Sequence, residues 1–339
     1  LKYRVTKNPY DIFSFGEEHT LIYDKSVTYA QLFENEKQNQ LWLFTRVNSV
    51  TWEFRYSSDE GETWSVPNKF LISDAGGLFY FNVRKQYVPT QTAVEEQWVF
   101  ALYGHPLISM DHTIRSGIFD ADGWLLTMEG ERTGLNLYGE VDGQKTETLL
   151  KLPELAVVYS APAGSTVRLL EVAPTRPLRV GLATFQMAHP ESITYYMATY
   201  RSGVWALSQP IAKGGAFLAP YQTDGAQTYV GGMACYYGVG QAGLNVMNGG
   251  DTETNRVYLA RADETGWAVE SYVSHDCGAS YQMEQEIKRI PASDGRKIWR
   301  PIVPIHAQDN LPVYWHEGTY SAHTGGWHCD TVMLIEYDD

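Results

Sequence analysis

The chain of 339 residues has little cysteine: its three thiols are Cys235, Cys277 and Cys329. So few cysteines exclude a disulfide framework, and the fold must therefore depend on its apolar core. The sequence also lacks an apolar run long enough to cross a bilayer, so we expect no membrane partner. No signal peptide stands at the start of the chain.

Basic residues are scarce as well. Lys and Arg number 26 against 40 Asp and Glu, which gives a formal net charge of −14, and no run of Lys or Arg occurs. Phosphate binding needs a basic footprint, so this balance argues against a nucleic-acid partner. It does not exclude an acidic polysaccharide, because a few Arg and His side chains in one cleft can reverse the local field.

Helical periodicity is nearly absent. Only residues 280–288 show any such pattern, and we expect a loop or a single turn there. Strand-like runs recur instead, and the 23 Tyr and 10 Trp suit both strands and a surface on which sugar rings stack. The chain is therefore predicted to be all-β, with strands at 27–33, 40–46, 52–56, 97–103, 114–120, 194–200, 257–261, 313–315 and 332–337.

One turn sequence is especially informative. Residues 57–64 read Ser-Ser-Asp-Glu-Gly-Glu-Thr-Trp, and residues 274–281 repeat the pattern more loosely. In such an Asp-box the Asp side chain bonds backbone amides of its own loop and Gly takes the positive φ. Either copy alone could be an ordinary Asp-Gly hairpin. Two copies, each after a β-rich run and each ending in an aromatic residue, favour a repeat fold of the sialidase-like propeller type.

Glycine followed by tryptophan also recurs along the chain, at blade-sized intervals. The tryptophans concerned are Trp64, Trp124, Trp205, Trp267 and Trp327. Chance placement is the alternative, but four-stranded blades with aromatic packing between them would give this spacing. No linker or charge block divides the chain. We therefore expect a single β-propeller domain over residues 1–339.

Two polar residues interrupt apolar strands early in the chain. Tyr29 lies within Val-Thr-Tyr-Ala-Gln-Leu-Phe, and Arg46 ends Leu-Trp-Leu-Phe-Thr-Arg. Tyr29 could be a buried ring with a satisfied hydroxyl group. Arg46, if buried, needs a carboxylate or a ligand. Both are therefore candidates for a site near the propeller axis.

Histidines and tyrosines of the next strands form a second candidate group. His105 precedes a proline, which holds it in an extended conformation. His105 and His112 could each carry a proton, donate to a substrate carboxylate, or be loop residues. Tyr80 and Tyr87 bracket residues 81–84 and are expected to line the same mouth, in contact with substrate.

The last part of the chain gathers histidine and cysteine. Thiolate with imidazole is the preferred ligand set of zinc, so Cys277, His323 and Cys329 are candidate ligands of a structural zinc or calcium ion. Their spacing matches no compact zinc motif. Buried thiols and rim histidines are the alternative.

A family resemblance follows from these motifs. Segments 8–15, 27–33, 41–46 and 56–64, followed by 104–106 and 112–123, resemble in order the BNR-4 repeat proteins. Among these, the chain looks most like the seven-bladed ulvan lyases of polysaccharide lyase families 24 and 25. The likeness is strong over residues 1–130. Afterwards it is confined to the second Asp-box and to residues 314–320.

The resemblance implies a seven-bladed propeller that cleaves a uronate polysaccharide of the ulvan type by β-elimination. It assigns proton transfer to Tyr29, neutralisation of the uronate carboxylate to Arg46 and His105, and substrate contact to Tyr87. Such chemistry requires no catalytic metal. The implied protein is a secreted or periplasmic monomer whose partner is an acidic polysaccharide.

The chain departs from the family at its front. The family places a catalytic histidine about one blade before the strand that carries Tyr29, and here His19 is the only histidine before it, in a setting that does not match. We expect a truncated chain that lacks all or part of the first blade. A separate first blade, or Tyr29 as both base and acid, would also explain the difference.

Two other functions stay open at this stage. One is a sialidase-like glycoside hydrolase, which would need three arginines around a carboxylate and a Tyr/Glu nucleophile pair. The other is a sugar-binding propeller without catalysis, since a fold does not guarantee chemistry.

Overall fold

The regular structure of this chain is almost entirely β-strand. A computed structural model describes residues 1–8, 13–72, 78–90, 93–105, 112–175, 177–186, 189–214, 230–236, 255–303, 313–320 and 327–334, with backbone only at 189–192, 320 and 327–334. Within these ranges the only helical pieces are the 3₁₀ turns η1 (Leu152–Glu154) and η4 (Ala292–Asp294). The predicted all-β class is confirmed. No helix in these ranges is long and apolar enough to span a membrane.

The first two large sheets are antiparallel and follow the chain. The first has the order β3-β4-β5-β6, with a small pair, β1 and β2, beside it in the sequence. The second has the order β11-β10-β9-β8-β7, with β14 paired to β9. The bounds are β1 (Lys2–Tyr3), β2 (His19–Thr20), β3 (Val27–Asn35), β4 (Gln40–Val47), β5 (Thr51–Ser57), β6 (Asn68–Ile72), β7 (Phe79–Pro89), β8 (Val94–Gly104), β9 (Thr113–Asp120), β10 (Trp124–Leu126), β11 (Arg132–Asn136), β12 (Glu140–Val141), β13 (Gln144–Lys145) and β14 (Ala156–Ser160).

Three further large sheets follow, and β12 and β13 form a separate two-stranded sheet. The third has the order β15-β16-β17-β18 with β19 on β17, the fourth β20-β21-β22-β23, and the fifth β24-β25-β26. The bounds are β15 (Ser165–Ala173), β16 (Arg179–Gln186), β17 (His189–Arg201), β18 (Val204–Leu207), β19 (Ala212–Gly214), β20 (Gly232–Cys235), β21 (Asn255–Asp263), β22 (Gly266–Ser274), β23 (Gln282–Pro291), β24 (Lys297–Ile302), β25 (Tyr314–Tyr320) and β26 (Trp327–Leu334).

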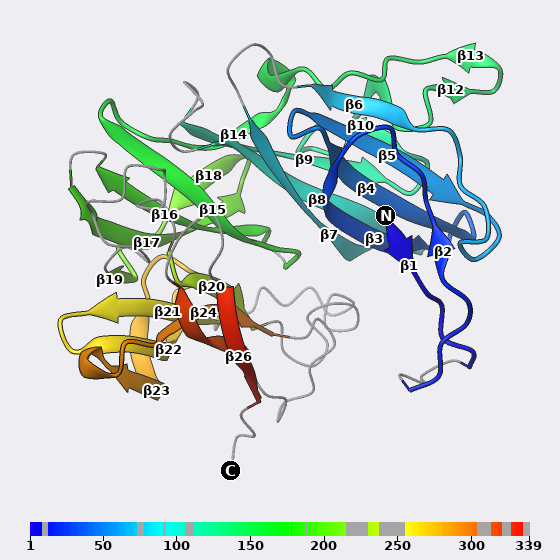
Figure 1. Cartoon of the computed structure of the whole chain (residues 1–339). Helices are drawn as coiled ribbons and strands as arrows, with labels where there is room; N and C mark the ends of the chain where they lie inside the picture. The colour runs from blue at the N-terminus through cyan, green and yellow to red at the C-terminus, as the bar shows by residue number, and fades with distance from the viewer. Residues whose placement is uncertain are drawn as a thin grey trace.

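Successive sheets pack face to face in chain order, from the blue sheet through the green and yellow sheets to the red strands of Figure 1. The first strands of the second to fifth sheets contact one another in turn: β7 contacts β15, β15 contacts β20, and β20 contacts β24. Between each neighbouring pair of sheets lies one apolar cluster. This is the blade packing of a β-propeller, as predicted from the repeated turns.

The central strands are buried on both faces because each one serves two of these clusters. In β8, Trp98 and Phe100 face the first sheet, whereas Val99 and Ala101 face the third. The side-chain period of two sends alternate residues to opposite faces. Burying a large apolar side chain contributes about 1.5–3 kcal/mol, so the clusters between blades hold the fold together.

The two predicted turns share one hydrogen-bond pattern. In the first, the Ser57 hydroxyl donates to Asp59 Oδ1 (2.7 Å), and Asp59 accepts from the Thr63 amide (2.8 Å) and hydroxyl. In the second, Ser274 donates to Asp276 (2.8 Å), which accepts from the Ser280 amide (2.9 Å) and hydroxyl. Each turn joins the third and fourth strands of its sheet.

One expectation about local structure was wrong. Residues 280–288 are not a loop, because most of them lie in the edge strand β23, whose first residues are exposed and so show no apolar alternation. The five tryptophans that follow glycine fall one in each successive large sheet, at the predicted blade-sized spacing, but not at equivalent positions. Trp64, Trp124 and Trp205 follow the third strand of their sheets, whereas Trp267 and Trp327 follow the second.

Candidate functional site

Tyr29 lies at a bulge in β3. Thr28 pairs with Arg46 and Gln31 with Phe44, so Tyr29 and Ala30 together oppose one residue of β4. Tyr29 has a φ of 54°, which costs an aromatic residue on the order of 1–3 kcal/mol. Bulges redirect side chains and are common beside active sites. Here the bulge leaves the Tyr29 side chain half exposed.

Arg46 lies directly beside this tyrosine. Its guanidinium carbon is 4.4 Å from the ring centroid of Tyr29 and 5.1 Å from that of Tyr80. The residue is only 7% exposed, and its Nε donates to Thr28 Oγ1 at 3.2 Å. Nη1 is buried without a hydrogen-bond partner among the described residues, and no described carboxylate forms an ion pair with Arg46. A buried cation in this state is well suited to receive an anionic group of a ligand.

Gln31 fixes the first sheet against the second at this point. Its side-chain Nε2 donates to the Phe81 carbonyl oxygen (2.9 Å), and its Oε1 accepts from the Val83 amide (3.0 Å). The side-chain amide of Gln31 thus links β3 to the backbone of β7 with two hydrogen bonds, as a residue of a neighbouring strand would do with its backbone. Because Gln31 is two residues after Tyr29 and Phe81 follows Tyr80, this bridge sets the two tyrosines edge to face at 5.6 Å.

Tyr80 links this pair to the next strands. It stacks on Tyr103 at 5.1 Å and lies 5.9 Å from the ring of His105. Tyr103 is buried, and burial raises its pKa to about 12. Tyr103 therefore stays a neutral phenol at ordinary pH, and its ring serves as a packing surface for Tyr80. We call Tyr29, Arg46, Tyr80, Tyr103 and His105 the tyrosine–arginine cluster.

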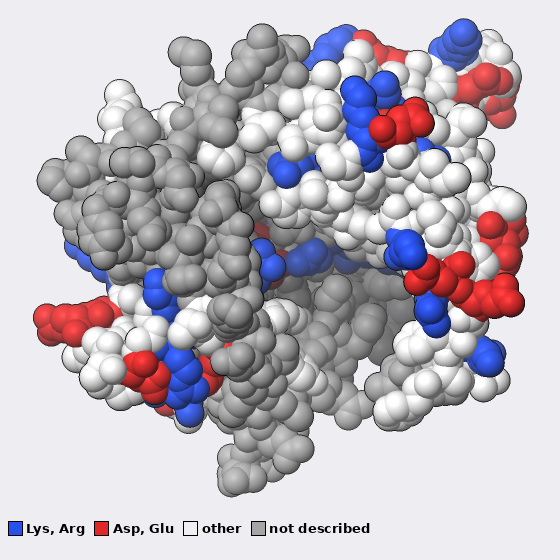
Figure 2. Space-filling view, in the orientation of Figure 1, with Lys and Arg blue, Asp and Glu red and all other residues white. Residues whose placement is uncertain are grey.

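Sequence reasoning missed Arg168 of β15. The charges of Arg168 and Arg46 both act on Tyr103, lowering its pKa against the effect of burial. Arg168 thus lies close enough to add positive potential to the cluster. The signal that singled out Arg46 was also present here, since Arg168 interrupts the apolar sequence Thr-Val-Arg-Leu-Leu. Figure 2 shows Lys and Arg side chains deep in a hollow near the middle of the face drawn, although the net charge is −14.

Two of the predicted substrate-contact residues, His112 and Tyr87, do not belong to the tyrosine–arginine cluster. His112 Nδ1 is hydrogen-bonded to Thr166 Oγ1 at 3.1 Å, two residues before Arg168 on β15. Tyr87 is not brought to the cluster. It lies seven residues beyond Tyr80 on the same strand, about 23 Å away at about 3.3 Å per residue. There its hydroxyl donates to Glu36 (2.6 Å), and Lys85 lies over its ring.

The predicted metal ligands are only partly described. Cys277 occupies the left-handed position of the second turn, with a φ of 63°, as Glu60 does in the first with a φ of 58°. His323 and the side chain of Cys329 lie outside the described residues. Across the described part of the chain, no group of three or more His, Cys, Asp or Glu side chains could hold a metal ion. A structural metal stays a prediction.

Comparison with known proteins points to a fold relation. No protein-family model matches the chain, and no curated protein sequence matches it. Among solved structures, an ulvan lyase of polysaccharide lyase family PL25 superposes with a TM-score of 0.60 at 14% identity, covering 94% of this chain and 68% of that chain. The same kind of enzyme bound to -[GlcA(1-4)Rha3S]- superposes with a TM-score of 0.62 at 14% identity and the same coverage. The chain is thus related in fold to ulvan lyases, as its motifs predicted.

Proposed function

We propose that this protein cleaves a uronate-containing polysaccharide by β-elimination, with Tyr29 in proton transfer and Arg46, together with His105, neutralising the uronate carboxylate. The observation that carries the proposal is Arg46. Arg46 is a residue only 7% exposed, it lies beside a half-exposed tyrosine, and it has no carboxylate partner among the described residues. Its guanidinium is therefore preorganised for an anionic ligand.

The reaction asks two things of such a site. The C5–H bond of the uronate and the C4–O4 bond break, a C4–C5 double bond forms, and the proton lost from C5 is balanced by a proton delivered to O4. Negative charge shifts onto the carboxylate as C5 loses its proton. A cation already placed at the carboxylate stabilises that charge without reorganisation, which lowers the barrier.

Tyr29 is the proton carrier best placed beside that cation. Its ring centroid lies 4.4 Å from the Arg46 guanidinium carbon, so the tyrosine and the cation proposed to hold the carboxylate are direct neighbours. Tyr80 lies slightly farther from the cation, at 5.1 Å, and Tyr103 is buried with a pKa of about 12 and is unsuited to lose a proton. The bulge at Tyr29 supports this role, because it leaves the side chain half exposed beside Arg46.

The fold relation supports the choice of substrate. One of the related ulvan lyase structures was solved with -[GlcA(1-4)Rha3S]- bound, so ulvan is the first polymer to test. A polymer of that kind is extracellular, and we propose a secreted or periplasmic location for this protein accordingly.

The test is an ultraviolet assay for the unsaturated product on ulvan, on a second uronate polymer and on a neutral polysaccharide. The wild-type protein should produce the chromophore from a uronate polymer only. Tyr29→Phe should reduce the rate on the order of 10²–10⁴-fold, as expected for loss of a general acid or base. Tyr87→Phe is the matched control, because Tyr87 lies at the far end of β7, and it should keep the wild-type rate. Full activity in Tyr29→Phe would rule out the assigned proton carrier.

A further inference from the structure

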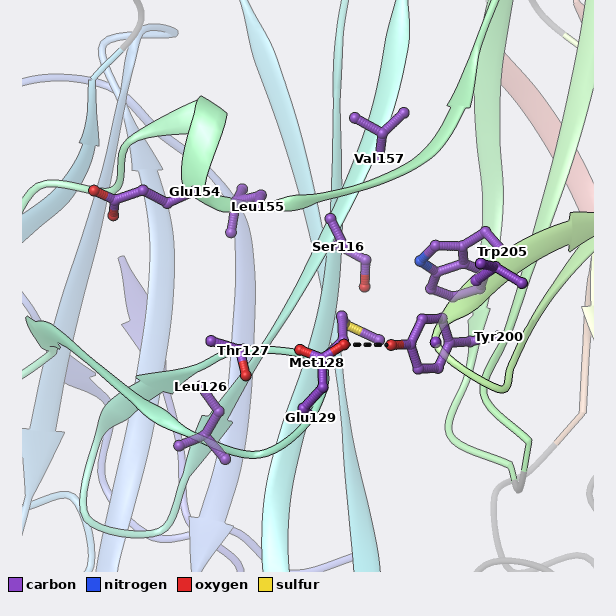
Figure 3. A pocket seen from close by; sticks show the side chains of 13 residues that line it. Ser116, Leu126, Thr127, Met128, Glu129, Glu154, Leu155, Val157, Tyr200 and Trp205 are labelled. Carbon is purple, nitrogen blue, oxygen red and sulfur yellow. Dashed lines mark hydrogen bonds between the residues drawn. The ribbon is translucent and has the colours of Figure 1, made fainter.

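A second pocket lies between the second and third sheets, on their outer strands. Its volume is about 500 Å³, within the range typical of small-molecule sites, about 300–1,000 Å³. Its walls come from β9 and the segment after β10 on one side, from residues 154–157 above, and from the β17–β18 hairpin opposite (Figure 3). No residue of the tyrosine–arginine cluster lines it. We call it the hairpin pocket.

Two aromatic side chains form one wall. Tyr200 and Trp205 are directly opposite in the antiparallel β17–β18 pair, and their ring centroids are 5.3 Å apart. The hairpin turns on Ser202 and Gly203, with φ values of 48° and 83°, the positive pair that a tight two-residue turn requires. This turn holds both rings in place, and rigid aromatic faces of this kind pack against the C–H faces of sugars.

The wall contains an unsatisfied donor. Trp205 Nε1 is buried and has no hydrogen-bond partner among the described residues. Figure 3 shows the indole nitrogen on the side of the ring that faces the pocket. A buried N–H group without an acceptor is costly. A ligand that presents an oxygen acceptor at this place would therefore gain a hydrogen bond that the free protein lacks.

The charge of the pocket selects among such ligands. Its lining includes Glu129 and Glu154 and no Lys or Arg. Glu129 Oε1 accepts from the Tyr200 hydroxyl at 3.0 Å, and this bond lowers the pKa of Glu129, which is therefore ionised at neutral pH. Glu154 lies 3.6 Å from Lys151, which does not line the pocket. The carboxylate of Glu129 can accept from ligand hydroxyls but repels an anionic sugar.

We propose that the hairpin pocket is a second carbohydrate site that takes an uncharged sugar unit, with its ring against Tyr200 and Trp205, an oxygen accepting from Trp205 Nε1, and a hydroxyl donating to Glu129. It is chemically opposite to the tyrosine–arginine cluster, which offers a cation to an acidic sugar. The two sites would let the protein hold a neutral unit of a polymer apart from the acidic unit in the cluster. The proposal stands whether or not the cluster is catalytic.

The test is calorimetric titration of the full chain with three uncharged sugars, D-glucose, L-rhamnose and D-xylose, and with D-glucuronate, which differs from glucose only at C6. At least one neutral sugar should bind. In Arg46→Met, which lacks the cation of the cluster, glucose should bind more tightly than glucuronate. Trp205→Phe, which keeps the ring and removes the N–H group, should weaken neutral-sugar binding about 5- to 10-fold, as expected for one buried hydrogen bond.

Three further variants make the result specific. Trp64→Phe is the matched control, because it makes the same change in a turn of the first sheet, and Arg46→Met removes the cation of the cluster; both should bind neutral sugar as the wild type does. Glu129→Gln should reduce the ratio of the glucuronate Kd to the glucose Kd, because it removes the charge that repels the uronate. Glu131→Gln should leave this ratio unchanged. Thermal unfolding of each variant checks the fold. Absence of neutral-sugar binding, an unchanged affinity in Trp205→Phe, or loss of binding in Arg46→Met would overturn the proposal.

Discussion

Arg46→Met separates a functional role of this arginine from a structural one. Arg46 is buried, its Nη1 has no partner, and no described carboxylate pairs with it. Methionine has a similar length and no charge. The change therefore removes the cation that the proposed reaction needs while filling most of the same space, and it leaves no buried anion behind.

The expected effect on stability follows from three contributions. Two cation–π contacts, to Tyr29 and Tyr80, are lost, at roughly 0.5–1 kcal/mol each. The charged hydrogen bond to Thr28 is lost, at roughly 1.5–3 kcal/mol. Against these stands the penalty of burying an unpaired ion, which is several kcal/mol. We expect the free energy of unfolding to stay within about 1 kcal/mol of wild type or to rise by up to about 2 kcal/mol, while lyase activity falls about 10²–10³-fold.

Arg55→Met is the matched control. Arg55 also lies over a tyrosine ring, Tyr23, at 4.5 Å, but it has a carboxylate partner in Glu53 at 4.0 Å, and Glu53 is only 6% exposed. Removing Arg55 leaves that carboxylate buried and unpaired, so stability should fall by about 2–4 kcal/mol with activity retained. Urea unfolding and the ultraviolet assay measure both effects. A fall of more than about 3 kcal/mol in the free energy of unfolding of Arg46→Met, with activity lost only in proportion to the unfolded fraction, would refute a functional role for Arg46.

Two other outcomes follow from the structure. Gln31→Ala should lower the free energy of unfolding by about 1–3 kcal/mol in urea, because the Phe81 carbonyl and Val83 amide lose their partner; an unchanged midpoint would contradict the bridge. Asp59 and Asp276 have pKa values lowered to about 2, above all by bonds from Thr63 and Ser280. The pKa of each carboxyl group is lower in the folded chain than its unfolded value of about 3.9. The ionised carboxylates therefore stabilise the fold above about pH 4, and this contribution is lost as the pH falls towards 2. Asp59→Asn should flatten the acid unfolding profile in that window, whereas an unchanged profile would contradict the assignment.

The sequence predicted the parts of the site that depend on local pattern. Strands β3 and β4, the turn at 57–64, and the exceptional character of Arg46 all follow from short runs of residues. The bulge at Tyr29 could not be predicted, because Val-Thr-Tyr-Ala-Gln contains no glycine to mark it. Its φ of 54° is imposed by pairing with β4 and by the bridge of Gln31 to β7.

Residues that meet across blades were the least predictable. Arg168 approaches Tyr103 because β15 packs beside β7 and β8, which no local pattern of either strand reveals. The sequence pattern groups Tyr87 with Tyr80, because it does not show that β7 runs unbroken from Phe79 to Pro89. The two tyrosines therefore lie near opposite ends of one strand. The hairpin pocket likewise depends on how β10 and β18 of different sheets come together.

The most direct test of the central claim is mass spectrometry of the products formed from a uronate polysaccharide in H₂¹⁸O. Elimination breaks the C4–O4 bond without adding water, so the account predicts products with an unsaturated uronate at the new non-reducing end and no ¹⁸O from the cleavage step. Cleavage products that carry one ¹⁸O and no double bond would show a hydrolase and contradict it, and so would the absence of cleavage.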